Sequence, residues 1–195
     1  MKLRESGMPE ESYWETLFDV GLILDRLEID ERLRDMVELG CGYGTFTLPV
    51  AQRISGTLRT FDIDVGMVEK TVRRAAAGKI GNIVCEERDV FSHGFGVAQE
   101  SQDACLLFNI LHCEEPRRLL GEAARVVQPE GFVYVIHWRY DPVTPRGPSM
   151  DIRPRPEQIV EWAKRTGLLA SPGPVLDLPP WHYGIRLHRP LMAAQ

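Results

Sequence analysis

The sequence lacks any apolar run long enough to cross a membrane. Its longest apolar stretches, 104–111 and 131–138, are far shorter than the roughly 20 residues that a transmembrane helix needs. The N-terminus is charged and has no apolar core of the kind that a signal peptide carries. We therefore expect a cytoplasmic protein with no membrane partner.

An excess of positive charge is also missing. The formal net charge is -5, and the basic residues are scattered among acidic ones. Proteins that bind nucleic acid usually present a basic patch or stripe, so we expect no nucleic-acid partner.

The four cysteines include no CxxC pair, and three of them lie in or beside apolar, strand-like segments. This spacing predicts reduced thiols, with neither a disulfide framework nor a zinc or other metal site. The residues concerned are Cys41, Cys85, Cys105 and Cys113.

Internal repeats, low-complexity tracts and a second domain are absent from the pattern. The 195 residues, with 44% hydrophobic and 26% charged, have ordinary globular composition and the size of one domain. We predict a single domain over 1–195, with a helical N-terminal lead-in at 1–30 and a core at 35–189. The sequence gives no prediction of the oligomeric state.

Strand-like and helix-like segments alternate along the core, which is typical of a parallel sheet with crossover helices. Pro129 and Gly131 indicate a turn into the fifth strand, and two extended stretches at 168–178 and 182–189 resemble an antiparallel hairpin. We predict an α/β fold with a Rossmann-like doubly wound sheet of about seven strands, mostly parallel, with an antiparallel C-terminal hairpin strand. The five strands expected before the hairpin are 36–39, 58–63, 83–88, 104–110 and 132–138.

A glycine-rich turn follows the first strand. Gly40, Gly42 and Gly44 let the backbone turn sharply and approach a ligand without intervening side chains. A dinucleotide fingerprint is the competing interpretation, but its third glycine would fall at position 45, which is Thr45. A tight turn without any ligand is the structural alternative.

The run Val37-Glu38-Leu39-Gly40-Cys41-Gly42-Tyr43-Gly44 resembles the nucleotide-binding motif of class I S-adenosylmethionine-dependent methyltransferases. More closely, the stretch 35–189 resembles the small stand-alone proteins called methyltransferase type 11 or methyltransferase domain proteins. The resemblance implies S-adenosyl-L-methionine as cofactor. It implies that an acid after the second strand binds the ribose, and that an acid and a backbone amide after the third strand bind the adenine. A residue after the fourth strand would lie near the methionine part. The cofactor-binding residues it implies are Glu38, Gly40, Cys41, Gly42, Gly44, Asp62, Ile63, Asp89, Val90 and Asn109.

Two of these acids have structural alternatives. Asp62 precedes a helix and so competes with Asp64 as the helix N-cap; we assign Asp62 to the ribose and Asp64 to the cap. Asp89 is either the adenine contact or a loop acid, and nearby Glu86 and Glu87 show that acids are common there.

Candidates for catalysis follow the fourth and fifth strands. His112 and His137 have side chains suited to a general base, and Cys113 to a nucleophile. For His112 and Cys113 the favoured interpretation is a first turn after the strand that is simply packed or solvated. Because methyl transfer from a sulfonium depends largely on alignment, a base is optional, and we name no catalytic residue.

Two aromatic segments are open to two interpretations. Trp181, His182 and Tyr183 either form one wall of an acceptor pocket or pack within the hairpin. In similar enzymes an N-terminal segment covers the cofactor, which makes the segment with Arg4, Tyr13 and Trp14 a candidate lid.

The function expected from this resemblance is methyl transfer to a small-molecule acceptor of unidentified kind. The alternatives are a non-catalytic S-adenosylmethionine-binding partner subunit and an aminopropyl-transferase-like enzyme on the same fold. A dehydrogenase is a third alternative, which the glycine spacing disfavours.

Overall fold

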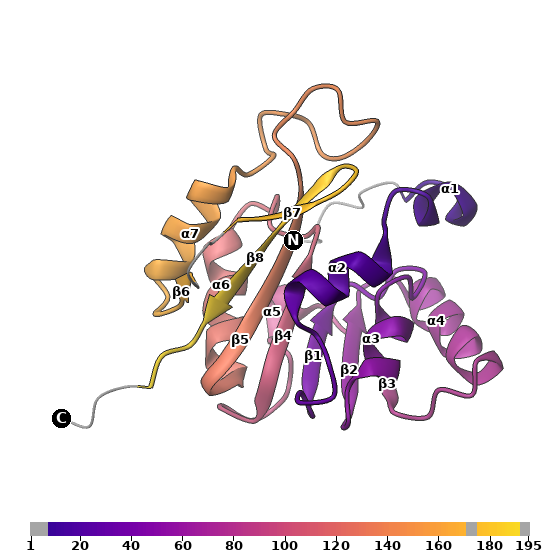
Figure 1. Cartoon of the computed structure of the whole chain (residues 1–195). Coiled ribbons are helices and arrows are strands. Elements are labelled where there is room, and N and C mark those ends of the chain that lie inside the picture. Colours follow the sequence, from indigo (N-terminus) through magenta and orange to yellow (C-terminus); the bar gives the residue numbers. More distant parts are fainter. Residues whose placement is uncertain (1–7, 171–174, 192–195) are drawn as a thin grey trace.

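The computed structural model describes residues 8–170 and 175–191, and within them one mixed sheet lies between two layers of helices (Figure 1). The sheet order is β3-β2-β1-β4-β5-β8-β6, and β7 pairs with the same strand, β8. The strands are β1 (Met36–Leu39), β2 (Leu58–Asp62), β3 (Ile83–Glu87), β4 (Gln102–Phe108), β5 (Val127–Trp138), β6 (Leu169–Ala170), β7 (Leu176–Leu178) and β8 (His182–His188).

The first five strands run parallel, and β8 runs antiparallel to β5, β6 and β7. β1 lies in the middle of the parallel part, with Leu39 opposite Phe61 on one side and Leu107 on the other. The predicted fold class is confirmed. Eight strands replace the expected seven or so because the stretch 168–178 supplies two short strands, β6 and β7, with 171–174 outside the described residues.

The predicted turn before the fifth strand is wrong. β5 begins at Val127 and continues through Pro129 and Gly131. Glu130 has a φ of 67°, and the register against β4 shifts at this point, so the chain forms a bulge inside one strand. An added Cβ at Gly131 would lie 2.6 Å from the carbonyl oxygen of Asp103, which explains glycine there.

Helices cover both faces of the sheet, and each face has its own apolar core. One core gathers α6 and α7 against β4, β5 and β8, and the other gathers α2 and α3 against the opposite face. The helices are α1 (Glu11–Glu15), α2 (Val20–Leu27), α3 (Thr47–Arg53), α4 (Val65–Ala77), α5 (Val90–His93), α6 (Pro116–Val126) and α7 (Pro156–Lys164).

The boundaries of α4 follow its sequence. The side chain of Asp64 accepts a hydrogen bond from the Gly66 amide at 2.8 Å, and Gly78 forms the C-cap. The assignment of Asp64 to the helix cap is therefore confirmed, which leaves Asp62 free for another role.

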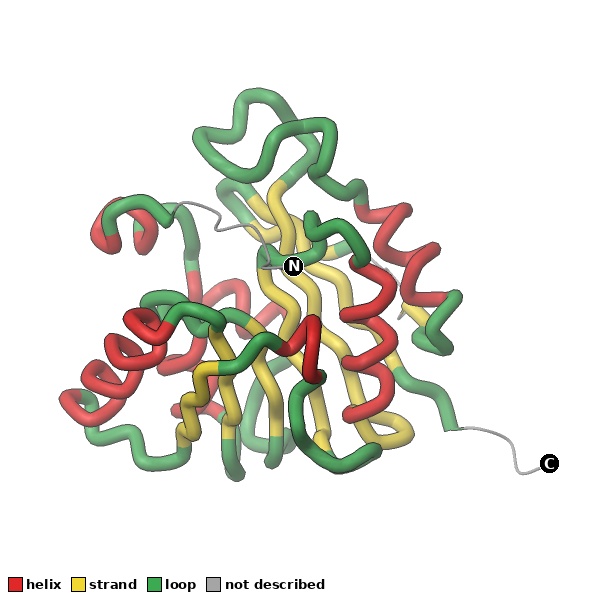
Figure 2. The backbone as a smooth tube through the Cα atoms, turned by 180° about the vertical axis from the view of Figure 1, so that it is seen from behind, coloured by secondary structure: helices red, strands yellow, loops and turns green. Residues whose placement is uncertain are grey.

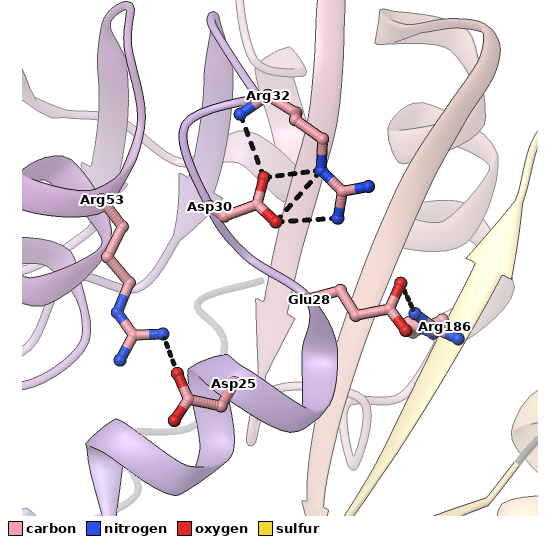
Figure 3. A network of polar contacts seen from close by, with 6 residues as sticks. All are labelled: Asp25, Glu28, Asp30, Arg32, Arg53 and Arg186. Carbon is pink, nitrogen blue, oxygen red and sulfur yellow. Dashed lines mark hydrogen bonds and ion pairs between the residues drawn. The ribbon is translucent and has the colours of Figure 1, made fainter.

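The lead-in helix α2 is held to its neighbours by ion pairs (Figure 3). Arg53 of α3 donates to Asp25 at 2.6 Å, and Arg186 of β8 pairs with Glu28 just after α2. Leu24 and Leu27 on the buried side of α2 are fully inaccessible to solvent. Burial of such side chains therefore contributes most of the free energy that holds α2 to the fold, and the ion pairs mainly fix the orientation of the helix. Within 8–170 and 175–191, no helix has both the length and the apolar character that spanning a bilayer requires.

Candidate active site

A cavity of about 1070 Å³ opens at the carboxyl ends of the parallel strands. In open α/β sheets ligands bind at this edge. The ends of β1, β2 and the turn after β3 line one side of the cavity, which we call the β1–β3 side. The ends of β4 and β5 and the long loop 139–155 line the other, the β4–β5 side, and Figures 1 and 2 show that loop standing over the strand ends.

The glycine turn forms the floor of the β1–β3 side. Gly40 has a φ of 86°, and an added Cβ would meet nothing within 4 Å, so the backbone here faces open cavity. Cys41 and Gly42 also line the cavity. Gly44 does not: its φ is 79°, and an added Cβ would lie 3.2 Å from Thr71 of α4, so this glycine serves the packing of the turn against a helix.

Asp62 ends β2 inside the cavity, with Ile63 beside it. One carboxylate oxygen accepts from the Gly42 amide at 3.0 Å, and the other accepts from the Asp64 amide at 3.0 Å. These contacts fix the carboxylate beside the glycine turn. A carboxylate has about four acceptor positions, so further ones are available for ligand hydroxyls.

Asp89 also lines the cavity, but its carboxylate begins a short helix that the sequence did not predict. It accepts from the backbone amide of Ser92 at 3.1 Å and from its hydroxyl at 2.7 Å, and so caps α5. Although burial opposes the shift, these hydrogen bonds hold the pKa of the Asp89 carboxyl below its ordinary value. Val90, the first residue of α5, lines the cavity next to it.

Glu38 lies beneath the glycine turn and is only 2% exposed. Thr47 donates its hydroxyl to the carboxylate at 2.6 Å. Burial raises the pKa of Glu38 to about 7, against which the Thr47 hydrogen bond acts. The carboxyl is therefore a buried group that changes charge near neutral pH.

Asn109 follows β4 at the boundary between the two sides of the cavity. Its φ is 55°, and its side-chain oxygen is buried without a hydrogen-bond partner in the described residues. A non-glycine residue in this conformation with an unpartnered polar atom suggests a position shaped for a ligand.

The two histidines named from the sequence lie in different environments. His112 lines the cavity, whereas His137 is fully buried in β5 and does not line it. Burial lowers the pKa of His112, and burial followed by the nearby His112 lowers the pKa of His137 well below its ordinary value. His137 is therefore not placed to contact an acceptor in this cavity, unlike His112.

The aromatic residues of the final hairpin do not line the cavity. His182 is fully buried between Phe18 and Trp138, with ring centroids at 4.4 Å and 4.2 Å, and Tyr183 donates its hydroxyl to the Pro154 carbonyl at 2.9 Å. Hairpin packing is the role that the structure gives them.

The loop 139–155 supplies cavity residues that the sequence analysis missed. Its shape depends on Arg153, which is only 6% exposed. The guanidinium donates to the carbonyls of Arg139 and Pro148 at 2.9 Å and 2.8 Å and to the Thr144 hydroxyl at 2.5 Å. Arg153 therefore ties both ends of the loop together over the cavity.

We expect Arg153→Met to loosen this loop. Hydrogen bonds from a charged donor contribute roughly 1.5–3 kcal/mol each, so local opening should become at least about tenfold more frequent. Trypsin cleavage after Arg146, measured under native conditions, reports this opening. Arg165→Met, which removes only an exposed ion pair with Glu161, is the control and should leave the cleavage rate unchanged. Equal rates for the two variants would contradict the role of Arg153.

The N-terminal segment contributes Met8 and Trp14 to the cavity wall. Tyr43 in the glycine turn donates its hydroxyl to the Pro9 carbonyl at 2.8 Å. Glu11 of α1 pairs with Lys70 and Arg74 of α4, the latter at 2.7 Å. Arg4, named with the candidate lid, lies outside the described residues.

Comparison with known proteins agrees with this geometry. Residues 36–131 match the family model described as "Methyltransferase domain", and no curated protein matches the sequence. The fold is similar to a SAM-dependent methyltransferase from Aquifex aeolicus, with 17% identity, a TM-score of 0.79, and coverage of 92% of this chain and 94% of that one.

Two further solved structures show how widely the fold is used. The N-methyltransferase NodS from Bradyrhizobium japonicum is 16% identical with a TM-score of 0.67, over 93% of this chain and 97% of that one. The [4+2]-cyclase SpnF is 15% identical with a TM-score of 0.71, over 96% of this chain and 85% of that one. The matched domain at 36–131 and the fold around it are those of a class I S-adenosylmethionine-dependent methyltransferase.

Proposed function

We propose that this enzyme transfers the methyl group of S-adenosylmethionine to a small-molecule acceptor bound on the β4–β5 side of the cavity. The observation that carries the proposal is one continuous cavity of about 1070 Å³ that joins the glycine turn to the aromatic strand ends. Ligand pockets usually span roughly 300–1,000 Å³, so this cavity has room for a nucleoside cofactor and a second small molecule.

The residues of the β1–β3 side fit the cofactor. The bare backbone at Gly40 and Gly42 allows close approach, and Asp62 offers acceptor positions to the ribose hydroxyls. Asp89, Val90 and Asn109 also line the cavity, which supports our assignment of the first two to the adenine and of Asn109 to the methionine part. When bound, the cofactor supplies a methyl group on a positively charged sulfur, and the protein aligns the acceptor with it.

Calorimetry with S-adenosylmethionine, S-adenosylhomocysteine and NAD tests the cofactor assignment. We expect micromolar binding of both sulfur nucleosides and no binding of NAD. Binding of NAD alone would support a dehydrogenase, and binding of none of the three would contradict the proposal.

The similarity to a cyclase on the same fold makes a separate test of methyl transfer necessary. Cofactor carrying a radiolabelled methyl group, incubated with a panel of small acceptors, should yield a labelled product. Tight cofactor binding without transfer to any acceptor would favour the non-catalytic partner subunit.

We also propose that the N-terminal segment acts as a lid over the cofactor. Glu11→Gln breaks its ion pairs with Lys70 and Arg74, and because exposed pairs contribute roughly 0–1 kcal/mol, we expect the release rate of S-adenosylhomocysteine to rise by about two- to fivefold. Glu69→Gln, which breaks an exposed pair with Arg73 on the same helix, is the control. Equal release rates, measured by stopped-flow fluorescence, would contradict the lid.

We also propose a cellular location and an acceptor class for this enzyme. The four cysteines are free thiols, which supports the reducing cytoplasm as its location. The net charge of -5 supports a small-molecule acceptor rather than a nucleic acid.

A further inference from the structure

Two histidines lie one behind the other at the β4–β5 side of the cavity. The rings of His112 and His137 are 5.6 Å apart between centroids and meet edge to face at 74°. The Nδ1 atom of His112 and both ring nitrogens of His137 are buried without a hydrogen-bond partner in the described residues. Of the four ring nitrogens in this pair, Nε2 of His112 is the one that is not both buried and unpartnered. Because His112 lines the cavity, this nitrogen is the one available to a ligand.

Unpartnered buried nitrogens are costly, so their clustering needs a reason. A neutral imidazole carries one N–H donor and one acceptor nitrogen. His137 is held neutral by burial, which lowers its pKa strongly, and by His112, His182 and Arg153, which oppose a further positive charge. No hydrogen bond joins the two rings in this structure. A neutral His137 has one acceptor nitrogen, and a small rotation of the adjacent rings would let it accept from the Nδ1–H of His112 and leave Nε2 of His112 as a base.

The surroundings indicate what the base would act on. Aromatic side chains of Trp14, Phe108, Trp138 and Tyr140 line the same cavity as His112, and Trp14 and Trp138 are 6.4 Å apart between centroids. Such a wall suits a flat, aromatic ligand.

The charged groups on this side do not favour a cation. Three guanidinium groups, of Arg146, Arg153 and Arg155, and two carboxylates, of Glu114 and Asp151, line it. Arg155 itself stacks on the Tyr140 ring at 3.6 Å. The balance favours a neutral or anionic acceptor over an ammonium group.

We propose that His112 is the general base for an aromatic hydroxyl acceptor and that His137 positions it. This inference rests on the proposed methyltransferase function. As the hydroxyl proton passes to Nε2 of His112, the acceptor oxygen forms a bond to the methyl carbon, the carbon–sulfur bond breaks and its electron pair stays on sulfur. The proton then leaves His112 for solvent, which restores the neutral base.

Two probes separate a base from a structural role. Phenol is neutral near pH 7.5 and needs a base, whereas 4-nitrophenol is already largely ionised and does not. We would measure the binding of both to the complex with S-adenosylhomocysteine by calorimetry, and their methylation with labelled S-adenosylmethionine. The variants are His112→Gln, His137→Phe and, as a control at the far end of β8, His188→Gln.

In His112→Gln we expect methylation of phenol to fall about 100-fold, the lower range for loss of a general base, while methylation of 4-nitrophenol falls less than about fivefold. His137→Phe should show a smaller loss confined to phenol, and His188→Gln no loss. The wild-type rate with phenol should also decline at low pH as His112 is protonated, at a pH below the ordinary histidine range because burial lowers its pKa.

Equal losses for both phenols in His112→Gln, or no loss for either, would overturn the proposal, as would failure of the wild-type complex to bind or methylate the phenols. The same calorimetry separates this failure from that of the proposed function. If S-adenosylhomocysteine binds normally and the phenols do not, the acceptor class is wrong; if S-adenosylhomocysteine does not bind, the methyltransferase function itself is wrong.

Discussion

Asp62→Ala should weaken the binding of S-adenosylhomocysteine by at least about 100-fold, because each hydrogen bond to a charged group contributes roughly 1.5–3 kcal/mol and we propose that the carboxylate accepts two from the ribose. The wild-type side chain is held in place by the amides of Gly42 and Asp64, both at 3.0 Å. A carboxylate that is already held in place loses little conformational entropy when the ligand binds. Its removal should therefore appear mainly as lost affinity.

Asp64→Ala is the matched control, only two residues away. Asp64 caps α4 through the Gly66 amide at 2.8 Å, so its loss should lower the free energy of unfolding by about 1 kcal/mol while affinity stays within about twofold. Asp62→Asn keeps the shape and one acceptor oxygen, and should fall between alanine and wild type. If Asp62→Ala binds the ligand as tightly as wild type, or Asp64→Ala weakens binding equally, Asp62 is not the ribose contact.

The parts of the fold that could be predicted from sequence are those governed by local chemistry. The α4 helix begins at the Asp64 cap and ends at Gly78, as its residues indicate. The bulge in β5 could not be predicted, because Pro129 and Gly131 are also ordinary turn residues and only the pairing with β4 shows that the strand continues.

How deeply each side chain lies within the site was harder to predict than where its residue stands along the chain. Alternation along β5 does not separate His137 from the cavity, because both faces of the strand are buried and yet Trp138, on the face opposite His137, lines the cavity. Gly44 packs against Thr71, a contact between segments far apart in sequence. Neither periodicity nor a motif indicates that Arg153 would organise its loop, since its partners are mostly backbone carbonyls, which every residue has.

The second large effect concerns the pH dependence of stability. Glu38 is ordinarily expected to titrate near 4.5, but burial raises its pKa in the folded protein to about 7. Between these values the unfolded chain releases this proton and the folded protein keeps it, so ionisation favours unfolding as the pH rises. At about 1.4 kcal/mol per pH unit, Glu38 alone should lower the free energy of unfolding by about 3 kcal/mol from pH 4.5 to 7.

Glu38→Gln should abolish this contribution, because glutamine is close in shape to the protonated acid and keeps an oxygen for the Thr47 hydroxyl. Urea unfolding at pH 4.5, 5.5, 6.5 and 7.5 would measure it as the difference between wild type and variant, in which the effects of the other titrating groups cancel. Glu87→Gln, at the exposed end of β3, should follow the wild-type curve. A constant difference between wild type and Glu38→Gln at all four pH values would mean that folding does not raise the pKa of Glu38 above its ordinary value. The buried carboxyl would then carry a negative charge beneath the glycine turn at neutral pH rather than titrate near it.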